Sequence, residues 1–325
     1  MNVDNEKCII VYDSYEEFFT DVISTSNLYQ RLYAGIEDYV YRGVSSDNYA
    51  LIPSVLRKDN TKRRLFHTVP FKENASVSEN QEVTISNCEY TQIAGELQVL
   101  SDFYKKANDQ GLWLPECTQL QSMYDQFATY AKILKDKEFI WYTREIAQLA
   151  GLAQHSGLAT RMLDWSQDLL TAVYFAAHGA CKQIFEKSTE LGKYIVIWLL
   201  NRKMIGLQFK NPYPLKIIVP SYYDNCNLRA QKGILSYWEM RIDSGAIDQL
   251  RNSLVDRTPL DEKLLKFREY KLKEFPLIYK LMIPIGDCKN ALSHIRTLGY
   301  CSAKLYPGYD GVIQQLDDET MINSI

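Results

Sequence analysis

The chain has 325 residues, a formal net charge of -3, and 46% hydrophobic and 24% charged residues. This composition is typical of a soluble globular protein that forms one large domain or two ordinary ones. The slightly acidic balance excludes a protein whose whole surface attracts nucleic acid, although it leaves room for local basic patches.

The seven cysteines are odd in number and never form a Cys-x-x-Cys pair, and the four histidines are dispersed. The sequence therefore predicts free thiols in a reducing compartment and no metal site. The N-terminus has no signal-peptide pattern, and the longest strongly apolar run, residues 194–200, is too short to cross a bilayer. We expect a cytoplasmic protein that has no membrane partner.

A short apolar strand is predicted at residues 9–12, followed by a helix that starts from the capping box at residues 14–17. Residues 39–43, Tyr-Val-Tyr-Arg-Gly, predict a second strand, which carries Arg42 directly before Gly43. The arginine has two interpretations. It binds a phosphate or carboxylate through its planar fork, with the glycine allowing close approach of the ligand, or it is paired with a structural carboxylate.

Basic residues cluster between Arg57 and Arg64, where a solvated face is the usual interpretation and nucleic-acid contact the rarer one. The polar segment around residues 58–90 predicts an exposed loop. Apolar stripes at residues 93–104 and 120–134, and a helix ending near Gln154, predict a block of helices.

Residues 153–177 combine polar groups with a following apolar helix. Helical spacing up to Gln154, with Gly157 as the stop, places His155 near a helix C-terminus, where a protonated imidazole is favoured. Ser166 is expected to cap a buried helix from about Asp168 to Gly179. One interpretation is a binding shelf where Arg161 and His155 face an anion and Asp164 orients one of them. The other is a buried Asp164–Arg161 ion pair, with Trp165 in the core.

After Gly179 the patterns favour strands, which are predicted at residues 194–200, 215–219, 234–238 and 277–283. Residues 243–275 predict a charged helical insertion, and residues 287–298 predict a helix. No internal repeat, Walker loop or dinucleotide-binding glycine pattern is found.

Three segments together resemble the FRG domain family, which is named for a Phe/Tyr-Arg-Gly motif. They are Tyr41-Arg42-Gly43 with residues 51–57, residues 152–166 with Ala172-Val-Tyr-Phe-Ala176, and Arg229-Ala-Gln-Lys-Gly233. With the ending at residues 305–311, the resemblance extends over about residues 9–316. It implies a single FRG domain across residues 1–325.

A weaker resemblance is to mono-ADP-ribosyltransferases. These place an aromatic-Arg-Gly on an early strand, a serine-containing strand before an Ala-x-x-Phe helix, and a catalytic Glu on a later strand. Arg42 matches the first position, and Asp164 to Ser166, before Ala172 and Phe175, matches the second. At the third position Gln231 stands near where the Glu is expected. The implied fold is α+β, with a mixed β-sheet core like that of ADP-ribosyltransferases, surrounding helices and helical insertions.

The second resemblance also implies NAD as the substrate and no metal. Cleavage of nicotinamide from NAD passes through an oxocarbenium-like state, which a carboxylate stabilises. Gln231 is neutral and offers little charge, so Asp164 is the expected carboxylate and His155 the expected acid or base. The predicted catalytic residues are Arg42, His155, Asp164 and Gln231. The predicted substrate-binding residues are Tyr41, Gly43, Arg161, Trp165, Ser166 and Arg229.

The leading expectation is NAD-dependent ADP-ribosyl transfer or NAD hydrolysis by a bacterial or phage-related toxin or defence effector, with a protein or nucleic acid as acceptor. The first alternative, which Gln231 favours, is a non-catalytic FRG module that binds a nucleotide or ADP-ribose. A further alternative is a nucleic-acid-targeting enzyme that is guided by the basic residues between Arg57 and Arg64.

Overall fold

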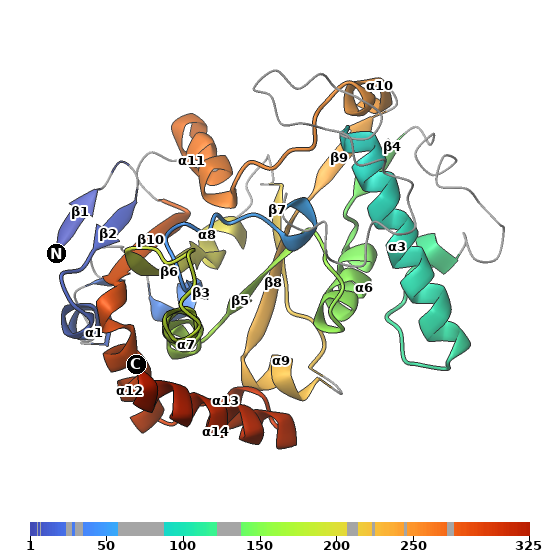
Figure 1. The fold of residues 1–325 in the computed structure, drawn as a ribbon. Coiled ribbons are helices and arrows are strands. Elements are labelled where there is room, and N and C mark those ends of the chain that lie inside the picture. The colour runs from blue at the N-terminus through green and yellow to red at the C-terminus, as the bar shows by residue number, and fades with distance from the viewer. Residues whose placement is uncertain are drawn as a thin grey trace.

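The computed structural model describes residues 1–4, 6, 8–23, 28–29, 35–57, 88–121, 138–206, 214–222, 225–243, 246–271 and 276–325. Its strands are β1 (Asn2–Asp4), β2 (Ile9–Val11), β3 (Tyr39–Val44), β4 (Glu138–Trp141), β5 (Met162–Ser166), β6 (Tyr194–Asn201), β7 (Leu215–Ile218), β8 (Gly233–Trp238), β9 (Met240–Asp243) and β10 (Ile278–Pro284). Eight of them form one sheet in the order β1-β2-β10-β6-β3-β5-β8-β7, and β4 pairs with β9 (Figure 1).

Neighbouring strands of the large sheet are antiparallel except for β2 and β10, which are parallel. The helices are α1 (Tyr15–Ile23), α3 (Glu89–Asp109), α6 (Arg144–His155), α7 (Leu169–Phe185), α8 (Arg202–Gly206), α9 (Cys226–Ala230), α10 (Ala246–Arg251), α11 (Leu260–Lys271), α12 (Cys288–Thr297), α13 (Ser302–Leu305) and α14 (Tyr309–Ser324). The predicted α+β fold with a mixed sheet is confirmed.

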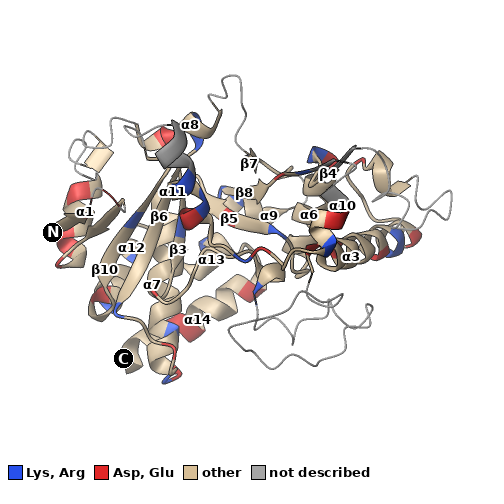
Figure 2. Cartoon of the chain, turned by 90° about the horizontal axis from the view of Figure 1, so that it is seen from above, with Lys and Arg blue, Asp and Glu red and all other residues tan. Residues whose placement is uncertain are grey.

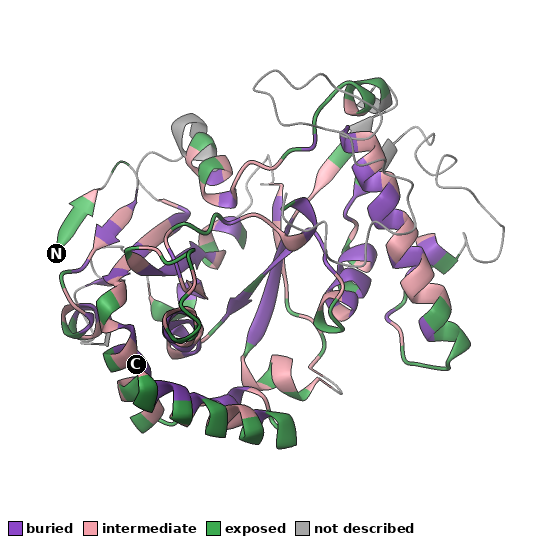
Figure 3. Cartoon of the chain, in the orientation of Figure 1, coloured by how far each residue is buried: buried purple, intermediate pink, exposed green. Residues whose placement is uncertain are grey.

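Helices cover both faces of the central strand β6, which explains why its sequence is apolar without alternation. Ile195, Ile197 and Leu199 pack in a cluster with α1, α7 and α12. Val196 and Leu200 point to the other face and pack with residues of α8 and α11. Figure 3 shows the middle strands as the most buried part of the molecule, with exposed residues along the outer sides of α14.

The β5–β8 end of the sheet is covered by α6 and α3. Met162, Leu235 and Tyr237 from the strands pack in one cluster with apolar residues of these two helices. Two of the helices that the sequence predicts before residue 155 are therefore present, as α3 and α6, and they cover the β5–β8 end of the sheet. Figure 2 shows both acidic and basic residues on the described helices, although α1 and α14 carry acidic residues without basic ones.

Helix α7 lies very close to strand β3 at Gly43. A Cβ atom at this position would stand 1.8 Å from the carbonyl oxygen of Ala172, which no side chain tolerates. The glycine of the Tyr-Arg-Gly motif is therefore required for the close packing of a helix on a strand. Gly43 also borders the pocket described below, so this packing role stands beside the expectation that it admits a ligand.

A buried polar cluster fastens α13 and α14 to α7. Tyr174 donates a hydrogen bond of 3.2 Å to Asp318, Ser302 donates to the same carboxylate, and His178 Nε2 lies 2.7 Å from its other oxygen. Burial disfavours the charged Asp318, but the hydrogen bonds from His178 and Ser302 outweigh it and hold the pKa below its ordinary value of 3.8. The C-terminal segment is thus tied to the core by a charged group.

We expect Asp318→Asn to lower the free energy of unfolding near neutral pH, and this difference to shrink as the pH falls below 3.8. A carboxyl whose folded-state pKa is depressed contributes stability above its unfolded pKa and loses it as pH falls through the folded pKa. Urea unfolding of both proteins across this range measures the effect. The exposed neighbour Asp317 provides the control, Asp317→Asn, and a difference that does not change with pH would contradict the prediction.

Several boundaries differ from the sequence-based expectations. Residues 88–90 of the predicted loop are not exposed: Cys88 and Glu89 are buried and α3 begins there, while residues 58–87 lie outside the described part. In the segment 243–275, α10 and α11 are the described helices, and α11 packs Leu260 and Leu264 onto the sheet.

Strands β1, β4 and β9 and the long helix α14 had no strong periodic signal in the sequence. Predictions for residues 123–134 and Lys58 to Arg64 also lie outside the described residues.

Among the described residues, none of the helices is both long enough and apolar enough to cross a membrane. All seven cysteines are free thiols, and five of them are buried. The structure thus contains no disulfide among its cysteines, and the core is held by packing and polar contacts.

Candidate functional site

The large sheet splits between β3 and β5. These neighbours pair only at Tyr41 and Ser166, whereas β3 continues to pair with β6 as far as Val44 and β5 pairs with β8 back to Met162. Beyond the single pair the two strands leave backbone groups that need other partners. Nη1 of Arg42 donates to the backbone carbonyl of Asp164 at 2.6 Å. The arginine thus provides a hydrogen-bond partner for a backbone group of β5 where β5 and β3 no longer pair.

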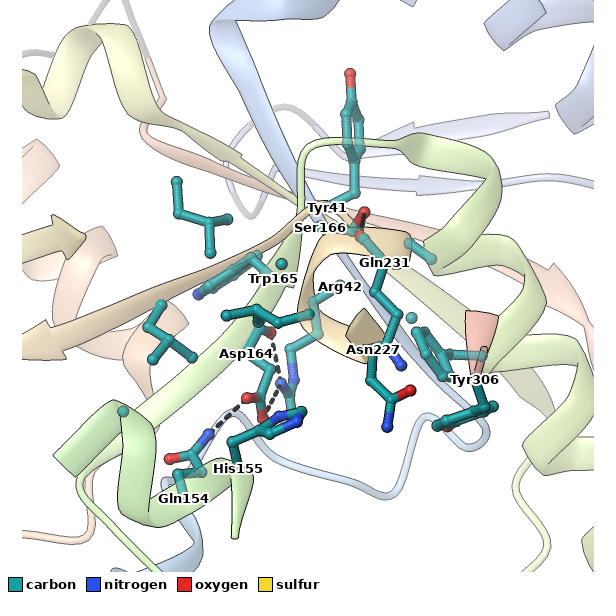
Figure 4. Close-up of a pocket in the computed structure, with 18 residues that line it drawn as sticks. Tyr41, Arg42, Gln154, His155, Asp164, Trp165, Ser166, Asn227, Gln231 and Tyr306 are labelled. Atoms are coloured by element: carbon teal, nitrogen blue, oxygen red, sulfur yellow. Dashed lines mark hydrogen bonds and ion pairs between the residues drawn. The ribbon is translucent and has the colours of Figure 1, made fainter. Parts of the chain in front are cut away.

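A pocket of about 520 Å³ lies at this split, a volume within the range of small-molecule sites. Its walls come from α6, β3, β5, α7, the α9–β8 turn and Tyr306 of the C-terminal segment (Figure 4). Eight of the ten residues predicted for the site border it, namely Tyr41, Arg42, Gly43, His155, Asp164, Trp165, Ser166 and Gln231.

Arg42 and Asp164 form the charged centre of the pocket. Nη1 of Arg42 lies 3.6 Å from Asp164 Oδ2, and the two side chains are 18% and 66% exposed. Nε of Arg42 is buried and has no hydrogen-bond partner among the described residues. The guanidinium therefore keeps an unsatisfied donor, and the carboxylate stays accessible to solvent or ligand.

Gln154 orients the Asp164 carboxylate. Its amide nitrogen donates to Asp164 Oδ1 at 2.5 Å, while its amide oxygen accepts a hydrogen bond from the buried hydroxyl of Thr160. Because the oxygen is occupied by Thr160, the nitrogen faces Asp164. Gln154 has no distinctive signal in the sequence, since it is a glutamine at the end of an apolar helix.

His155 is the last residue of α6, and its side chain is exposed at the edge of the pocket. The predicted helix end is confirmed, and Gly157 has the positive φ of 93° that ends such a helix. The exposed imidazole of His155 therefore lies where it can contact a ligand in the pocket.

Ser166 and Gln231 form mainly structural hydrogen bonds at the bottom of the pocket. Ser166 Oγ donates to the Gln231 carbonyl at 2.7 Å and accepts from the Asp168 backbone. The side-chain nitrogen of Gln231 donates to the Leu305 carbonyl at 3.1 Å. Gln231 lies in the turn before β8 rather than on a strand, and Asp168, not Ser166, caps α7 through Leu170 N. The predicted cap is therefore corrected.

The side chains of Tyr41 and Trp165 belong to the core. The buried Tyr41 hydroxyl donates to the Ile36 carbonyl, and Figure 4 shows its ring pointing away from Arg42. The indole nitrogen of Trp165 donates to Ser236 at 2.8 Å, and the ring packs among apolar residues. Both residues border the pocket while they stabilise the sheet, as the structural interpretation of Trp165 expects.

Arg161 does not border the pocket, which corrects its assignment as a substrate-binding residue. It is 6% exposed, its Nε donates to both carboxylate oxygens of Glu96 at 2.8 and 2.9 Å, and its Nη2 lies 2.6 Å from Glu89. Burial disfavours the charged guanidinium, but the two carboxylates outweigh it and raise the pKa of Arg161. The predicted Asp164–Arg161 pair is wrong, because Asp164 pairs with Arg42 instead.

Arg229 lies on the exposed side of α9 and also does not border the pocket. The pocket instead takes Asn227 and Leu228 from this helix, together with Phe175 of α7 and Tyr306. Asn227 had no sequence signal of its own. Tyr306 lies in the ending at residues 305–311 that supports the FRG resemblance, but no site role was predicted for it.

The described residues hold no group of three or more His, Cys, Asp or Glu side chains that is arranged to bind a metal ion. The polar side chains that line the pocket are a guanidinium, an imidazole, one carboxylate, amides, hydroxyls and an indole.

Comparison with known families gives one match. Residues 37–183 match the model of the FRG domain, and this range contains Arg42, Gln154, His155, Asp164, Ser166 and Phe175. No curated protein and no solved structure matches the chain. Asn227, Gln231 and Tyr306 border the same pocket from outside the matched range. The resemblance to the FRG domain family noted in the sequence is thereby supported over residues 37–183.

Proposed function

We propose that the pocket binds NAD and releases nicotinamide, either by hydrolysis or by transfer of ADP-ribose to an acceptor. The observation that supports this proposal is the meeting of Arg42, Asp164 and His155 in one cavity at the sheet split. They come from three different elements, of which β3 lies about a hundred residues before α6 and β5 in the sequence. A toxin or defence role, with a protein or nucleic acid as acceptor, remains part of the same proposal.

Arg42 is the proposed ligand of the diphosphate. One nitrogen is used by the Asp164 carbonyl, while the buried Nε has no partner among the described residues. An unsatisfied buried donor on a permanently charged group is stabilised when an anion accepts its hydrogen bond. The diphosphate of a dinucleotide provides such oxygens.

Asp164 is the proposed stabiliser of the reacting ribose. When the C1′–N bond breaks, its electron pair leaves with nicotinamide and positive charge develops on the ribose. A carboxylate held by Gln154 at 2.5 Å stabilises that charge without having to reorganise. Water or an acceptor nucleophile then forms the new bond to C1′ and gives up its proton, for which His155 is the proposed base.

A non-catalytic module that binds a nucleotide or ADP-ribose is the second candidate. The observation that favours it is Gln231, which stands where a catalytic glutamate is expected and donates its amide to Leu305. Such a module would use Arg42 for the phosphates and need no carboxylate. The nucleic-acid-targeting alternative rests on residues that mostly lie outside the described part, and salt-independent binding would exclude it.

Release of nicotinamide from NAD by the purified chain is the first test. We expect release by the wild type and a loss of NAD affinity of about 10- to 100-fold in Arg42→Ala, as for a charge-assisted hydrogen bond. Arg241→Ala is the matched control, because this side chain is 68% exposed and does not border the pocket. Circular dichroism checks that each variant is folded.

The outcomes separate the candidates. Binding that depends on Arg42 without any release would replace the enzyme by the binding module. A wild type that neither binds nor cleaves NAD would exclude the enzyme, and a further failure to bind ADP-ribose or ADP would exclude the binding module. The FRG match over residues 37–183 does not depend on either result.

A further inference from the structure

An aromatic corner, formed by Phe175 and Tyr306, closes one side of the pocket. The ring centroids are 6.4 Å apart and the ring planes meet at 78°, an edge-to-face arrangement. Both side chains are half-buried and both border the cavity. Such a pair leaves part of a ring face free to contact another flat ring. Asn227 lies on the same side and offers an amide with donors and an acceptor.

The aromatic corner and the carboxylate lie on opposite sides of Arg42. In Figure 4, Asp164 and Gln154 are on one side of the Arg42 side chain, while Asn227 and Tyr306 are on the other. The packing of the helices agrees with this order, because α7 covers β3 and β6 and α6 covers the β5–β8 end. The pocket therefore offers three successive surfaces: a carboxylate, a guanidinium and an aromatic pair.

Tyr306 is held firmly in this place. Its backbone nitrogen donates to Ser302 at 2.8 Å, and a Cβ atom on Gly311 would stand 1.8 Å from its carbonyl oxygen. The preceding residue, Leu305, accepts the hydrogen bond from Gln231. The backbone that carries the ring is thus fixed both by its own segment and by the turn that carries Gln231, and the ring itself packs against Phe175. A ring on a fixed backbone loses less entropy when it binds another ring.

We propose that Phe175 and Tyr306 bind the base of a dinucleotide, at the end of the ligand opposite the bond that is cleaved. The diphosphate then contacts Arg42 and the reacting ribose lies at Asp164. This inference rests on the proposed function and specifies its substrate class as a base joined through a diphosphate to the reacting ribose. Stacking on the aromatic corner provides affinity for the base, and the Asn227 amide forms hydrogen bonds with the polar edge of the base.

Binding of ADP, which has a base and a diphosphate but no nicotinamide bond, tests this arrangement without turnover. Calorimetric titration is expected to show at least about 5-fold weaker ADP binding by Tyr306→Ala, as for the loss of one base-stacking contact. Pyrophosphate binding to the same variant is expected to stay within about twofold of the wild type. Tyr306→Phe is expected to keep ADP affinity, because it keeps the ring. Tyr309→Ala is the matched control, since Tyr309 is 92% exposed.

Three results would overturn the inference: no ADP binding by the wild type, an unchanged ADP affinity in Tyr306→Ala, or an equal weakening for ADP and pyrophosphate. If Tyr306→Ala fails to fold, Phe175→Leu is used instead, because it removes an aromatic ring of the same corner and keeps a similar side-chain volume. Its ADP and pyrophosphate affinities are expected to change as described for Tyr306→Ala. None of these results decides the proposed function, which fails only when the wild type does not cleave NAD.

Discussion

Replacing Asp164 with Asn is expected to lower the rate of nicotinamide release about 100- to 1,000-fold while the protein stays folded. The substitution removes the charge that would stabilise the ribose and keeps the shape of the side chain. Arg42 still donates to the backbone carbonyl of residue 164, and an amide oxygen still accepts from Gln154. The loss is therefore expected in the chemical step and not in folding.

The measurement is the rate of nicotinamide release at saturating NAD, with thermal unfolding recorded on the same samples. Asp317→Asn is the matched control, because Asp317 is exposed and lies on α14 away from the pocket. An unchanged rate in Asp164→Asn, beside an active wild type, would remove Asp164 from the mechanism. A parallel loss of stability would assign it a structural role instead.

The second large effect is expected at Arg161, which we predict to be a stability residue. Arg161→Met should lower the free energy of unfolding by about 3 to 5 kcal/mol, since it leaves two buried carboxylates without their cation. Glu89 and Glu96 come from α3, whereas Arg161 directly precedes β5. The variant therefore weakens the attachment of the helical block to the sheet.

Chemical denaturation of Arg161→Met measures this loss. Adding Glu89→Gln and Glu96→Gln to the same chain is expected to recover part of it, because the variant then buries no uncompensated charge. A single substitution that costs less than about 1 kcal/mol would contradict the prediction, because surface ion pairs are worth no more than that. The folded fraction of the variant is expected to keep wild-type ligand affinity, as Arg161 does not border the pocket.

Much of the fold is predictable from local patterns. The apolar run of β6, the strand that carries Arg42 and the helix ending at His155 lie where periodicity and helix-end residues place them. The helix after Asp168 begins as predicted, but it continues through Gly179 to Phe185. These signals are local, since they depend on which faces of a strand or helix are buried and on which residues end a helix. β4 and β9 were missed because a short strand in a two-stranded sheet has little pattern of its own.

Charge pairing was less predictable, as Arg42, Arg161 and Asp164 illustrate. The sequence offered one aspartate three residues from Arg161 and suggested that they pair. In the structure Arg161 pairs with Glu96, 65 residues earlier, and Asp164 lies against Arg42, 122 residues away. Sequence proximity has little weight here, because strand pairing decides which side chains face each other.

The sequence by itself determined the mixed α+β architecture, the FRG motif and most of the residues that meet in the pocket. Only the tertiary structure decided that β3 and β5 part after one residue pair, that Gln154 orients Asp164, and that Tyr306 closes the cavity. The physical reason is that motif residues are recognisable from their own neighbours along the chain. The shape of a cavity depends on contacts between segments more than a hundred residues apart, and no local pattern encodes them.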